Sequence, residues 1–222
     1  PYTSSAASDV YKRQMKIDDA GVTFQMSVDG STRHCTPESV LTFQRQLGPD
    51  IAMVLDHCPP GDAEPALQRV AHERTLRWAQ QARDLHDSWG GAARGQAVFG
   101  ICQGGTDPDL RSASAQALAK MDFDGYAIGG LSVGETKLQM ATALDACVDH
   151  LPGDKLRYMM GVGMPEDLAH ATAQGVDMFD CVIPTRHGRS HTAFHPDGKP
   201  LKLRNAQYAD CLLYTSDAAD EV

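Results

Sequence analysis

The regular alternation of short apolar runs with longer helical patterns constrains the fold more than any other feature of this chain. Apolar runs of strand length occupy residues 51–56, 97–105, 126–131, 157–162 and 178–184. They are apolar on both faces, which is typical of a parallel sheet that helices cover. Helical patterns lie between the runs, over residues 64–89, 107–121, 136–151 and 165–175. Since β-α-β connections are right-handed, we expect either a barrel or an open doubly wound sheet.

Local signals predict several element boundaries and one helix face. Pro108 falls in the first turn of its helix, and Gly175 is a good helix stop. Residues 191–205 read as a β-hairpin that turns at Pro196-Asp197-Gly198. The apolar residues expected to share the buried face of the helix over 64–89 are Leu67, Val70, Ala71, Trp78, Ala82 and Leu85.

Polar and glycine residues follow strand after strand, and they favour the barrel. No G-x-G-x-x-G sequence follows the first apolar run. A (β/α)8 barrel gathers its active site from the C-terminal ends of several strands at once. We therefore expect an α/β fold that is part of a (β/α)8 TIM barrel. The residues at the predicted strand ends are Asp56, Gln103, Gly129, Gly130, Gly161 and Asp180.

The two ends of the chain read as foreign sequence. Residues 4–14 and 211–221 back-translate into DNA strands that are reverse complements over their shared length, as a transposon-type sequencing adapter would be. We expect residues 1–14 and 211–222 to be adapter-derived tails, and residues 15–210 to form one partial-barrel domain. Cys211 would then not be a natural metal ligand.

The composition argues against several classes of protein. The 222 residues carry a formal net charge of −9, which argues against non-specific coating of nucleic acid but not against a local basic patch. No apolar run reaches the ~18 residues of a membrane helix, and no stretch reads as a secretory signal. The six cysteines have no compact, even spacing, so a reduced, cytoplasmic protein is expected.

Asp180 is the first candidate for a catalytic group, because it interrupts an apolar run. A carboxylate that is buried without a partner is costly. This one therefore either pairs with a helix or a neighbouring arginine, or it serves as a nucleophile or general acid/base. The mouth of a barrel favours the second reading. Arg186 and Arg189 follow in a predicted loop and suit bidentate phosphate contact, with solvated surface arginines as the alternative.

Asp56 and Gln103 are candidates for binding a flat, nitrogen-rich ligand. A carboxylate can accept two parallel hydrogen bonds from an edge such as N1–H and the exocyclic amine of guanine, and an amide can donate to a carbonyl. Gly104-Gly105 and Gly129-Gly130 would let backbone N–H groups approach such a ligand closely. Each signal alone has a plain alternative, a helix cap for the aspartate and a turn for each glycine pair.

The histidines and cysteines give weaker signals. His187, His191 and His195 are four residues apart, as helical metal ligands would be, but Gly188 and the hairpin argue against a helix there. Most cysteines are expected to be small buried groups, and Cys58 is a candidate for lining a pocket. We therefore assign no metal ligand. The cysteines without paired C-x-x-C spacing are Cys35, Cys58, Cys102, Cys147 and Cys181.

Five motifs in order resemble the bacterial tRNA-guanine transglycosylases. They are VLDHCPP (54–60), GICQGGTDPDLR (100–111), AIGGLSVGE (127–135), YMMGVGMPEDL (158–168) and GVDMFDCVIPTRHGR (175–189). The resemblance runs over essentially the whole predicted natural stretch. It implies a TIM-barrel pentosyltransferase that exchanges the guanine at the anticodon wobble position of tRNA for a 7-deazaguanine, in queuosine biosynthesis.

The resemblance also implies a role for each matching residue. Asp180 would be the nucleophile that forms a covalent ester with the ribose of a flipped-out nucleotide. The residues implied in substrate binding are Asp56, Cys58, Gln103, Gly129, Gly130, Leu131 and Met160. Those implied in RNA binding are Gly161, Val162, Gly163, Met164, Pro165, Glu166 and Asp167, followed by Thr185, Arg186, His187, Gly188 and Arg189.

Finer details of the base pocket follow from the same resemblance. Gly130 would contribute a backbone donor, Leu131 would offer its carbonyl to an aminomethyl group, and Met160 would cover the ring. Cys58 and Val133 resemble the bacterial pattern. The implied incoming base is therefore 7-aminomethyl-7-deazaguanine rather than the bulkier queuine.

Two family features have no match in the chain. The family's second catalytic Asp lies in a DSGGFQ-like segment, and nothing before Gly21 matches it. The family's zinc ligands, C-x-C-x-x-C and a later His, would lie beyond Asp210. We therefore expect a chain truncated at both ends, inactive and poorly stable alone. Its full-length form is expected to bind Zn²⁺, tRNA and the 7-deazaguanine base, and to form a homodimer without contact with a membrane.

Four other readings stay open. A non-catalytic partner subunit of the same fold would be expected to lack Asp180, and an archaeal-type relative would carry additional C-terminal RNA-binding domains. A barrel aldolase or phosphate-binding enzyme would be expected to carry a Schiff-base lysine on a strand. A metal-binding scaffold would use the three histidines at 187, 191 and 195.

Overall fold

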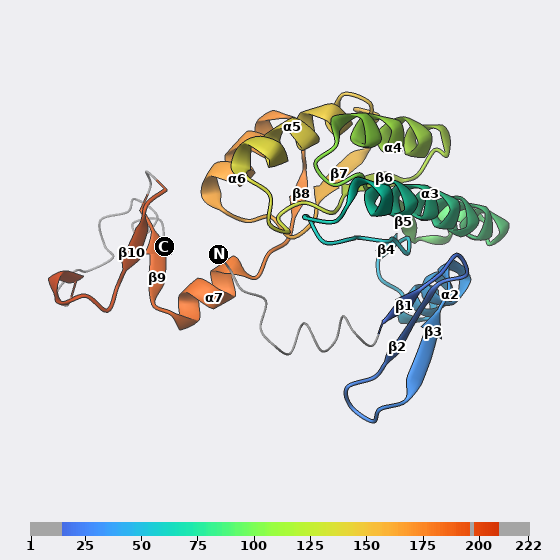
Figure 1. Cartoon of the computed structure of the whole chain (residues 1–222), viewed down its shortest axis with the longest axis horizontal. Coiled ribbons are helices and arrows are strands. Elements are labelled where there is room, and N and C mark those ends of the chain that lie inside the picture. The colour runs from blue at the N-terminus through green and yellow to red at the C-terminus, as the bar shows by residue number, and fades with distance from the viewer. Residues whose placement is uncertain (1–14, 196–197, 209–222) are drawn as a thin grey trace.

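A curled parallel sheet of five strands forms the centre of the computed structural model, which describes residues 15–195 and 198–208 (Figure 1). The strands lie side by side in chain order, and all neighbours are parallel. The predicted tails, residues 1–14 and 211–222, lie outside the described residues. The strand bounds are Ile51–Met53 for β4, Ala97–Cys102 for β5, Gly125–Ile128 for β6, Leu156–Met159 for β7 and Met178–Phe179 for β8.

Helices connect these strands and lie on the outer side of the sheet (Figure 1). In chain order they are α3 (Pro65–Ser88), α4 (Pro108–Lys120), α5 (Lys137–Val148) and α6 (Pro165–Ala173), and a 3₁₀ turn, Gly91–Arg94, follows α3. An open doubly wound sheet would carry helices on both faces. The curl and the one-sided helices therefore confirm the predicted partial (β/α)8 barrel.

The helix boundaries follow the local signals in the sequence. Pro108 is the first residue of α4, and Asp107 caps this helix by accepting from the backbone N–H of Asp109 at 2.9 Å. Gly175 has a φ of +89°, just beyond the end of α6. Both the predicted start and the predicted stop are therefore confirmed.

Helix α3 is buried along a shorter stretch than its sequence predicts. Trp78 and Ala82 are fully buried, but Leu67 and Val70 expose 41% and 43% of their surface. The prediction is wrong for these two residues, because the first turns of α3 lie at the C-terminal edge of the sheet. There Leu67 lines a cleft instead of the core.

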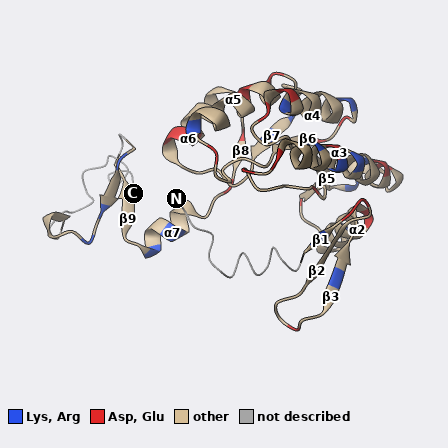
Figure 2. Cartoon of the chain, in the orientation of Figure 1, with Lys and Arg blue, Asp and Glu red and all other residues tan. Residues whose placement is uncertain are grey.

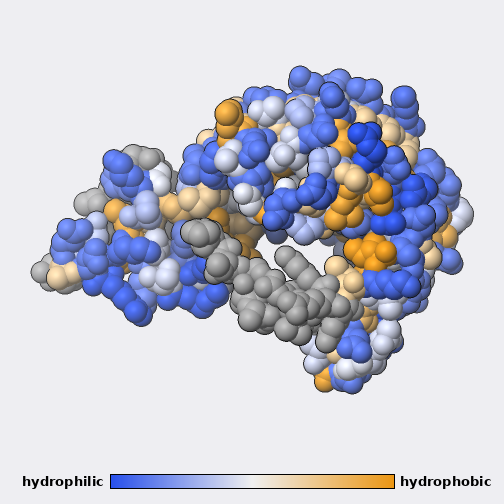
Figure 3. All heavy atoms as spheres, viewed as in Figure 1, coloured by the Kyte–Doolittle hydropathy of each residue, from blue (hydrophilic) through white to orange (hydrophobic). Residues whose placement is uncertain are grey.

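The hydrophobic core fills the space between the sheet and its helices. Strand residues such as Val98 and Ile128 are fully buried there, together with helix residues such as Leu118 and Leu144. The thiols of Cys102 and Cys147 lie in this core, with 3.6 Å between their sulfur atoms. Figure 3 shows a mainly hydrophilic surface with separate apolar patches. Within the described part of the chain, no helix has the length and apolar character needed to cross a membrane.

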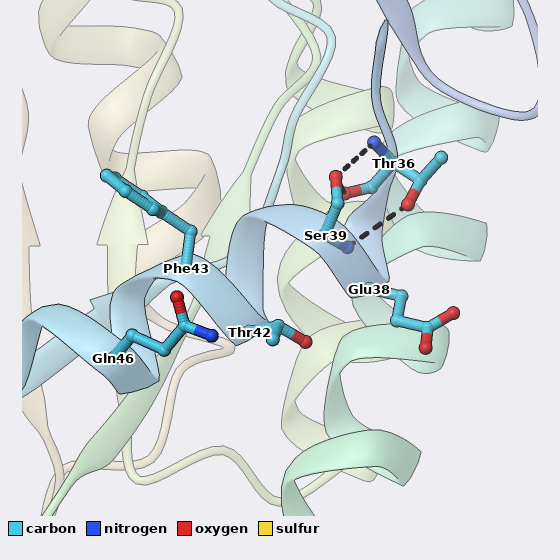
Figure 4. A pocket seen from close by; sticks show the side chains of 6 residues that line it. All are labelled: Thr36, Glu38, Ser39, Thr42, Phe43 and Gln46. Carbon is cyan, nitrogen blue, oxygen red and sulfur yellow. Dashed lines mark hydrogen bonds between the residues drawn. The ribbon is translucent and has the colours of Figure 1, made fainter.

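A small antiparallel sheet and a helix, which the sequence analysis did not predict, precede β4. The sheet consists of β1 (Lys16–Ile17), β2 (Val22–Gln25) and β3 (Thr32–Cys35), and α2 spans Pro37–Leu47. A capping box begins the helix: Thr36 and Ser39 each donate a backbone N–H to the other's hydroxyl, at 2.8 and 3.1 Å (Figure 4).

One aspartate attaches this N-terminal unit to the barrel. The carboxylate of Asp19 accepts hydrogen bonds from the guanidinium groups of Arg74 and Arg77, both at 3.0 Å. Its backbone carbonyl accepts from the indole N–H of Trp78 at 2.9 Å. Because all three donors lie on α3, the turn between β1 and β2 is held against that helix.

The segment after β8 differs from the prediction. Residues 183–189 form a short helix, α7 (Ile183–Arg189), where we expected a loop. Pro184 lies in its first turn, where a missing N–H costs nothing, and the N–H of Arg186 donates to the carbonyl of Val182 at 2.9 Å.

A hairpin follows α7, as predicted. Strands β9 (Thr192–Phe194) and β10 (Pro200–Lys202) are antiparallel, and a 3₁₀ turn, Ala206–Tyr208, comes after them. Residues 196–197 of the predicted turn lie outside the described residues.

Candidate active site

The predicted site residues follow the strands of the half-barrel at one edge. Cys102 pairs with Ile128, and Met159 pairs with Phe179, so neighbouring strands end close to one another. The next residues along the chain therefore lie at the C-terminal edge, where barrel enzymes have their active sites. They are Asp56 after β4, Gln103 after β5, Gly129 and Gly130 after β6, Met160 after β7 and Asp180 after β8.

Asp56 and Gln103, which follow the neighbouring strands β4 and β5, are joined by a direct hydrogen bond. The side-chain Nε2 of Gln103 donates to Oδ2 of Asp56 at 2.6 Å. Burial raises the pKa of the Asp56 carboxyl above its usual value, and this hydrogen bond opposes part of the rise. Gln103 is 1% exposed, and its Oε1 has no hydrogen-bond partner among the described residues. The pair therefore offers a carboxylate and a spare amide acceptor to a ligand that can donate.

The Gln103 amide packs directly against the backbone of Gly129 and Gly130. A Cβ atom on Gly130 would lie 2.2 Å from Oε1 of Gln103, and one on Gly129 would lie 2.9 Å from Nε2. Gly130 also has a φ of +67°, which disfavours other residues. The glycine pair therefore gives the Gln103 amide room to pack against the backbone, and the positive φ of Gly130 is also what the plain-turn reading predicts.

Asp180 directly follows β8 instead of lying within the strand, and its side chain is exposed. Its Oδ1 accepts two hydrogen bonds, from the Tyr158 hydroxyl at 2.6 Å and from the Gly161 N–H at 2.8 Å. The structural alternative required a helix or an arginine as the partner, whereas the partners seen here are a tyrosine hydroxyl and a backbone amide in a turn. Both come from β7 or the loop that follows it.

Tyr158 is a site residue that the sequence analysis missed. Burial, the hydrogen bond to Asp180 and the charge of Asp180 together raise the pKa of the Tyr158 hydroxyl to about 12. The hydroxyl therefore stays protonated, and remains a donor, across the whole physiological range. A tyrosine on an apolar strand reads as a core residue, so only the neighbouring strand end could have identified it.

The loops beside these residues are closely packed. A Cβ atom on Gly163 would lie 1.8 Å from the sulfur of Cys181, so the loop after β7 contacts the segment after Asp180. In the loop after β6, Leu131 is 4% exposed. The Glu135 carboxylate accepts from the backbone N–H groups of Ser132 and Val133. These contacts fix the backbone at the edge of the site.

A cleft of about 720 Å³ opens beside the segment that follows Asp56, but neither Asp56 nor Gln103 is among the residues that line it. Cys58 and Val133, the two predicted determinants of base size, both line it, together with Leu67 and Glu135. This volume is in the range of sites for small organic ligands.

Comparisons with known proteins place the chain in a family. The family model of queuine tRNA-ribosyltransferase matches residues 2–215. The chain belongs to the queuine tRNA-ribosyltransferase family. It is 48% identical over 195 residues to the queuine tRNA-ribosyltransferase of Novosphingobium aromaticivorans, which covers 88% of the chain and 52% of that relative.

Other members of the family are equally similar. The chain is 47% identical over 197 residues to the queuine tRNA-ribosyltransferase of Zymomonas mobilis, covering 89% of the chain and 51% of that relative. It is 45% identical over 209 residues to that of Stenotrophomonas maltophilia, covering 93% and 54%. The chain thus spans about half the length of the curated relatives it matches.

The segments predicted to bind RNA in this family member lie beyond β7 and β8. Residues 161–167 form the loop after β7 and the first turn of α6, where Asp167 is buried and pairs with Lys137. Residues 185–189 belong to α7, where Arg186 and Arg189 are exposed (Figure 2). The two arginines are therefore accessible to an RNA phosphate, whereas the Asp167 carboxylate already forms an ion pair with Lys137.

The histidines do not form a metal site in the structure. No group of three or more His, Cys, Asp or Glu side chains among the described residues could hold a metal ion. His187 packs its ring against Phe194, with 5.0 Å between ring centroids. The described residues therefore do not fit the zinc that the resemblance implies, and they give no support to a histidine-based scaffold.

Two rival readings also lose support within this family. None of the five parallel strands carries a lysine, so a Schiff-base aldolase has no strand lysine to use. A non-catalytic subunit would be expected to lack Asp180, which is present and hydrogen-bonded.

Proposed function

We propose that this chain is the base- and ribose-binding part of a tRNA-guanine transglycosylase that acts in queuosine biosynthesis. One observation carries the proposal. The exposed carboxylate of Asp180, which accepts two hydrogen bonds, lies at the same edge of the half-barrel as the hydrogen-bonded pair of Asp56 and Gln103. The family membership supports the same activity. The substrate would be a tRNA with guanine at the wobble position.

In the proposed reaction, Asp180 acts as a nucleophile on ribose. Its carboxylate oxygen attacks C1′, and the bond from C1′ to N9 of guanine breaks, with the electron pair leaving on the base. The resulting ester holds the RNA on the protein. N9 of the incoming base then attacks C1′, loses its proton and releases the carboxylate. This proton balances the one that the departed guanine takes up, and the two displacements retain the configuration.

We propose that hydrogen bonds to the N1, 2-amino and 6-oxo edge of the base provide its recognition. The Asp56 carboxylate would accept from N1–H and the 2-amino group of guanine. The 6-oxo group would accept from the Gly130 N–H and from the second N–H of the Gln103 amide, whose first N–H donates to Asp56. The Leu131 carbonyl and the walls at Cys58 and Val133 suit 7-aminomethyl-7-deazaguanine as the incoming base. Met160 lies beside Gly129, where its side chain would cover the ring.

The flanking segments would hold the RNA. Arg186 and Arg189 of α7 would contact phosphates next to the flipped nucleotide, together with the loop over 161–167. The full-length protein would form a homodimer and work in the cytoplasm. The five described strands supply part of an eight-stranded barrel, so we propose that the chain alone does not exchange bases.

Incorporation of labelled guanine into tRNA tests this function. We propose a chimera in which residues 15–208 replace the matching segment of the Zymomonas mobilis relative. The chimera is expected to label a tRNA with a wobble guanine, whereas a tRNA with wobble adenine stays unlabelled. The 222-residue chain alone is expected to label neither. A chimera that folds, with a cooperative melting transition, but labels no tRNA would contradict the proposal.

Replacing Tyr158 with phenylalanine tests how the proposed nucleophile is held. Loss of one hydrogen bond to a charged group is expected to lower the exchange rate constant kcat of the chimera about 10- to 100-fold, with little change in KM. Tyr208→Phe is the matched control, since that tyrosine lies in the last 3₁₀ turn. Equal kcat values for the wild type and Tyr158→Phe would show that this hydroxyl does not hold the nucleophile.

The pH dependence of stability tests the environment of the Tyr158 hydroxyl, which combines burial with the hydrogen bond to Asp180 and the charge of Asp180. Because the folded-state pKa of Tyr158 is raised to about 12, its stabilising contribution is complete below the unfolded value near 10. It is lost as the pH rises from 10 through 12. The difference in melting temperature between the wild type and Tyr158→Phe is therefore expected to shrink over that window.

A further inference from the structure

A single arginine beneath the base-reading loops carries an inference that deepens the proposed function and rests on it. Arg111, on α4, is 0% exposed. Its guanidinium donates to four backbone carbonyls and forms no ion pair with any described carboxylate. The acceptors are Gly105 at 2.7 Å, Cys102 at 3.1 Å, Gly129 at 2.7 Å and Gly130 at 3.2 Å.

These hydrogen bonds fix the direction of two N–H groups. In a planar trans peptide the N–H points away from the carbonyl of the preceding residue, and the chain has no cis peptide among its described residues. With the Gly129 and Gly130 carbonyls turned toward Arg111, the N–H groups of Gly130 and Leu131 point the opposite way. Neither of them donates to any described residue.

The charge of Arg111 also strengthens these donors. A cation bound to a carbonyl polarises the whole peptide unit, so its N–H becomes more positive. Hydrogen bonds from a charged donor are stronger than neutral ones, and here the charge is buried, where water does not screen it. The two N–H groups are thus preset for an oxygen that is negative or becomes negative.

We propose that Arg111 is a positioning residue that presents the N–H groups of Gly130 and Leu131 to the 6-oxo group of a purine. When the bond to ribose breaks, part of the electron pair left on the base is delocalised onto that oxygen. Preset donors aimed at a developing charge favour the transition state, as in an oxyanion hole. Arg111 acts only through the backbone and does not touch the base.

Equilibrium dialysis of the full 222-residue chain against two bases tests this role. Guanine and 6-thioguanine share the N1–H and the 2-amino group, but sulfur is a much weaker hydrogen-bond acceptor than oxygen. Arg111→Met is expected to weaken guanine binding about 10-fold and 6-thioguanine binding less than twofold. Arg157→Met is the matched control, because Arg157 also donates to a backbone carbonyl, that of Leu151, at 2.7 Å, away from the site.

The outcomes separate this inference from the function on which it rests. Arg111→Lys keeps the charge but has fewer donors, so we expect its affinity for guanine to fall about threefold and its affinity for 6-thioguanine to stay nearly unchanged. If Arg111→Met does not fold, as judged by the absence of a melting transition, Arg111→Lys is the variant that tests the role of Arg111. Equal losses for both bases, or no loss, would overturn the role of Arg111. If the wild-type chain binds neither base, the proposed base pocket itself is wrong.

Discussion

Asp180→Asn is expected to abolish base exchange by the chimera, with a loss in kcat of about 10⁴-fold or more. The amide keeps the size of the carboxylate and can still accept from Tyr158 and Gly161, so the local structure should persist. An amide oxygen is, however, a far poorer nucleophile toward C1′. The KM for tRNA is therefore expected to change little, because the phosphate and base contacts that we propose involve other residues.

The covalent intermediate gives a direct measurement of the same step. With tRNA and no incoming base, the wild-type chimera is expected to form a protein–RNA adduct that survives a denaturing gel. Asp180→Asn is expected to form none. Asp177→Asn, at the exposed residue just before β8, is the matched control and should form the adduct normally. An adduct with Asp180→Asn would mean that another group attacks the ribose.

Asp56→Asn is expected to weaken guanine binding about 10²- to 10⁴-fold, since it removes two hydrogen bonds to a charged acceptor. The new amide also places a donor opposite the donors of the base. Dialysis of labelled guanine against the 222-residue chain measures this effect. Asp154→Asn, an exposed aspartate in the turn before β7, is the control and should bind as the wild type does. Unchanged affinity in Asp56→Asn would remove Asp56 from the base pocket.

The same substitution is expected to make the unliganded chain more stable at neutral pH. Burial raises the pKa of Asp56, so the charged form is the costly one in the folded state. Stability associated with the protonated form is present below the unfolded pKa of about 3.9 and is lost as the pH rises through the folded pKa. The melting temperature of Asp56→Asn is thus expected to exceed that of the wild type by roughly 2–4 °C at pH 7, with a smaller gap near pH 4.

The parallel sheet could be predicted because its strands are short, apolar and regularly spaced. Each observed strand falls within or overlaps its predicted run, but ends earlier, as at Met53 and Phe179. Asp56 and Asp180 accordingly lie in loops after the strands. Hydrophobicity marks where a strand is buried but not where the ladder of backbone hydrogen bonds stops, since that depends on the neighbouring strand.

Other elements could not be predicted because their local signals point elsewhere. The strands β1 to β3 have mostly exposed or half-exposed residues and therefore no clear apolar period. Pro184 and Gly188 concealed helix α7, because both residues usually interrupt helices. In each case, tertiary contacts in the folded chain stabilise a strand or helix that the local sequence does not favour.

Arg111 and Tyr158 escaped prediction for a different reason. Arginine on an amphipathic helix is normally solvated, and nothing near Arg111 in the sequence identifies four distant carbonyls as its partners. Asp56 and Gln103, the proposed base-binding residues, could be named as candidates because they lie within three residues of the ends of β4 and β5. Residues that act by supporting others have no such position in the sequence.

The buried thiols of Cys102 and Cys147 give the chain a built-in reporter of its own unfolding. Both sulfur atoms lie in the core between β5 and α5, whereas Cys58 is exposed. An alkylating reagent can therefore reach Cys58 in the native state, but it reaches the core pair only when the sheet and its helices separate. The rate at which these two thiols are modified measures how often the half-barrel opens, without any engineered label.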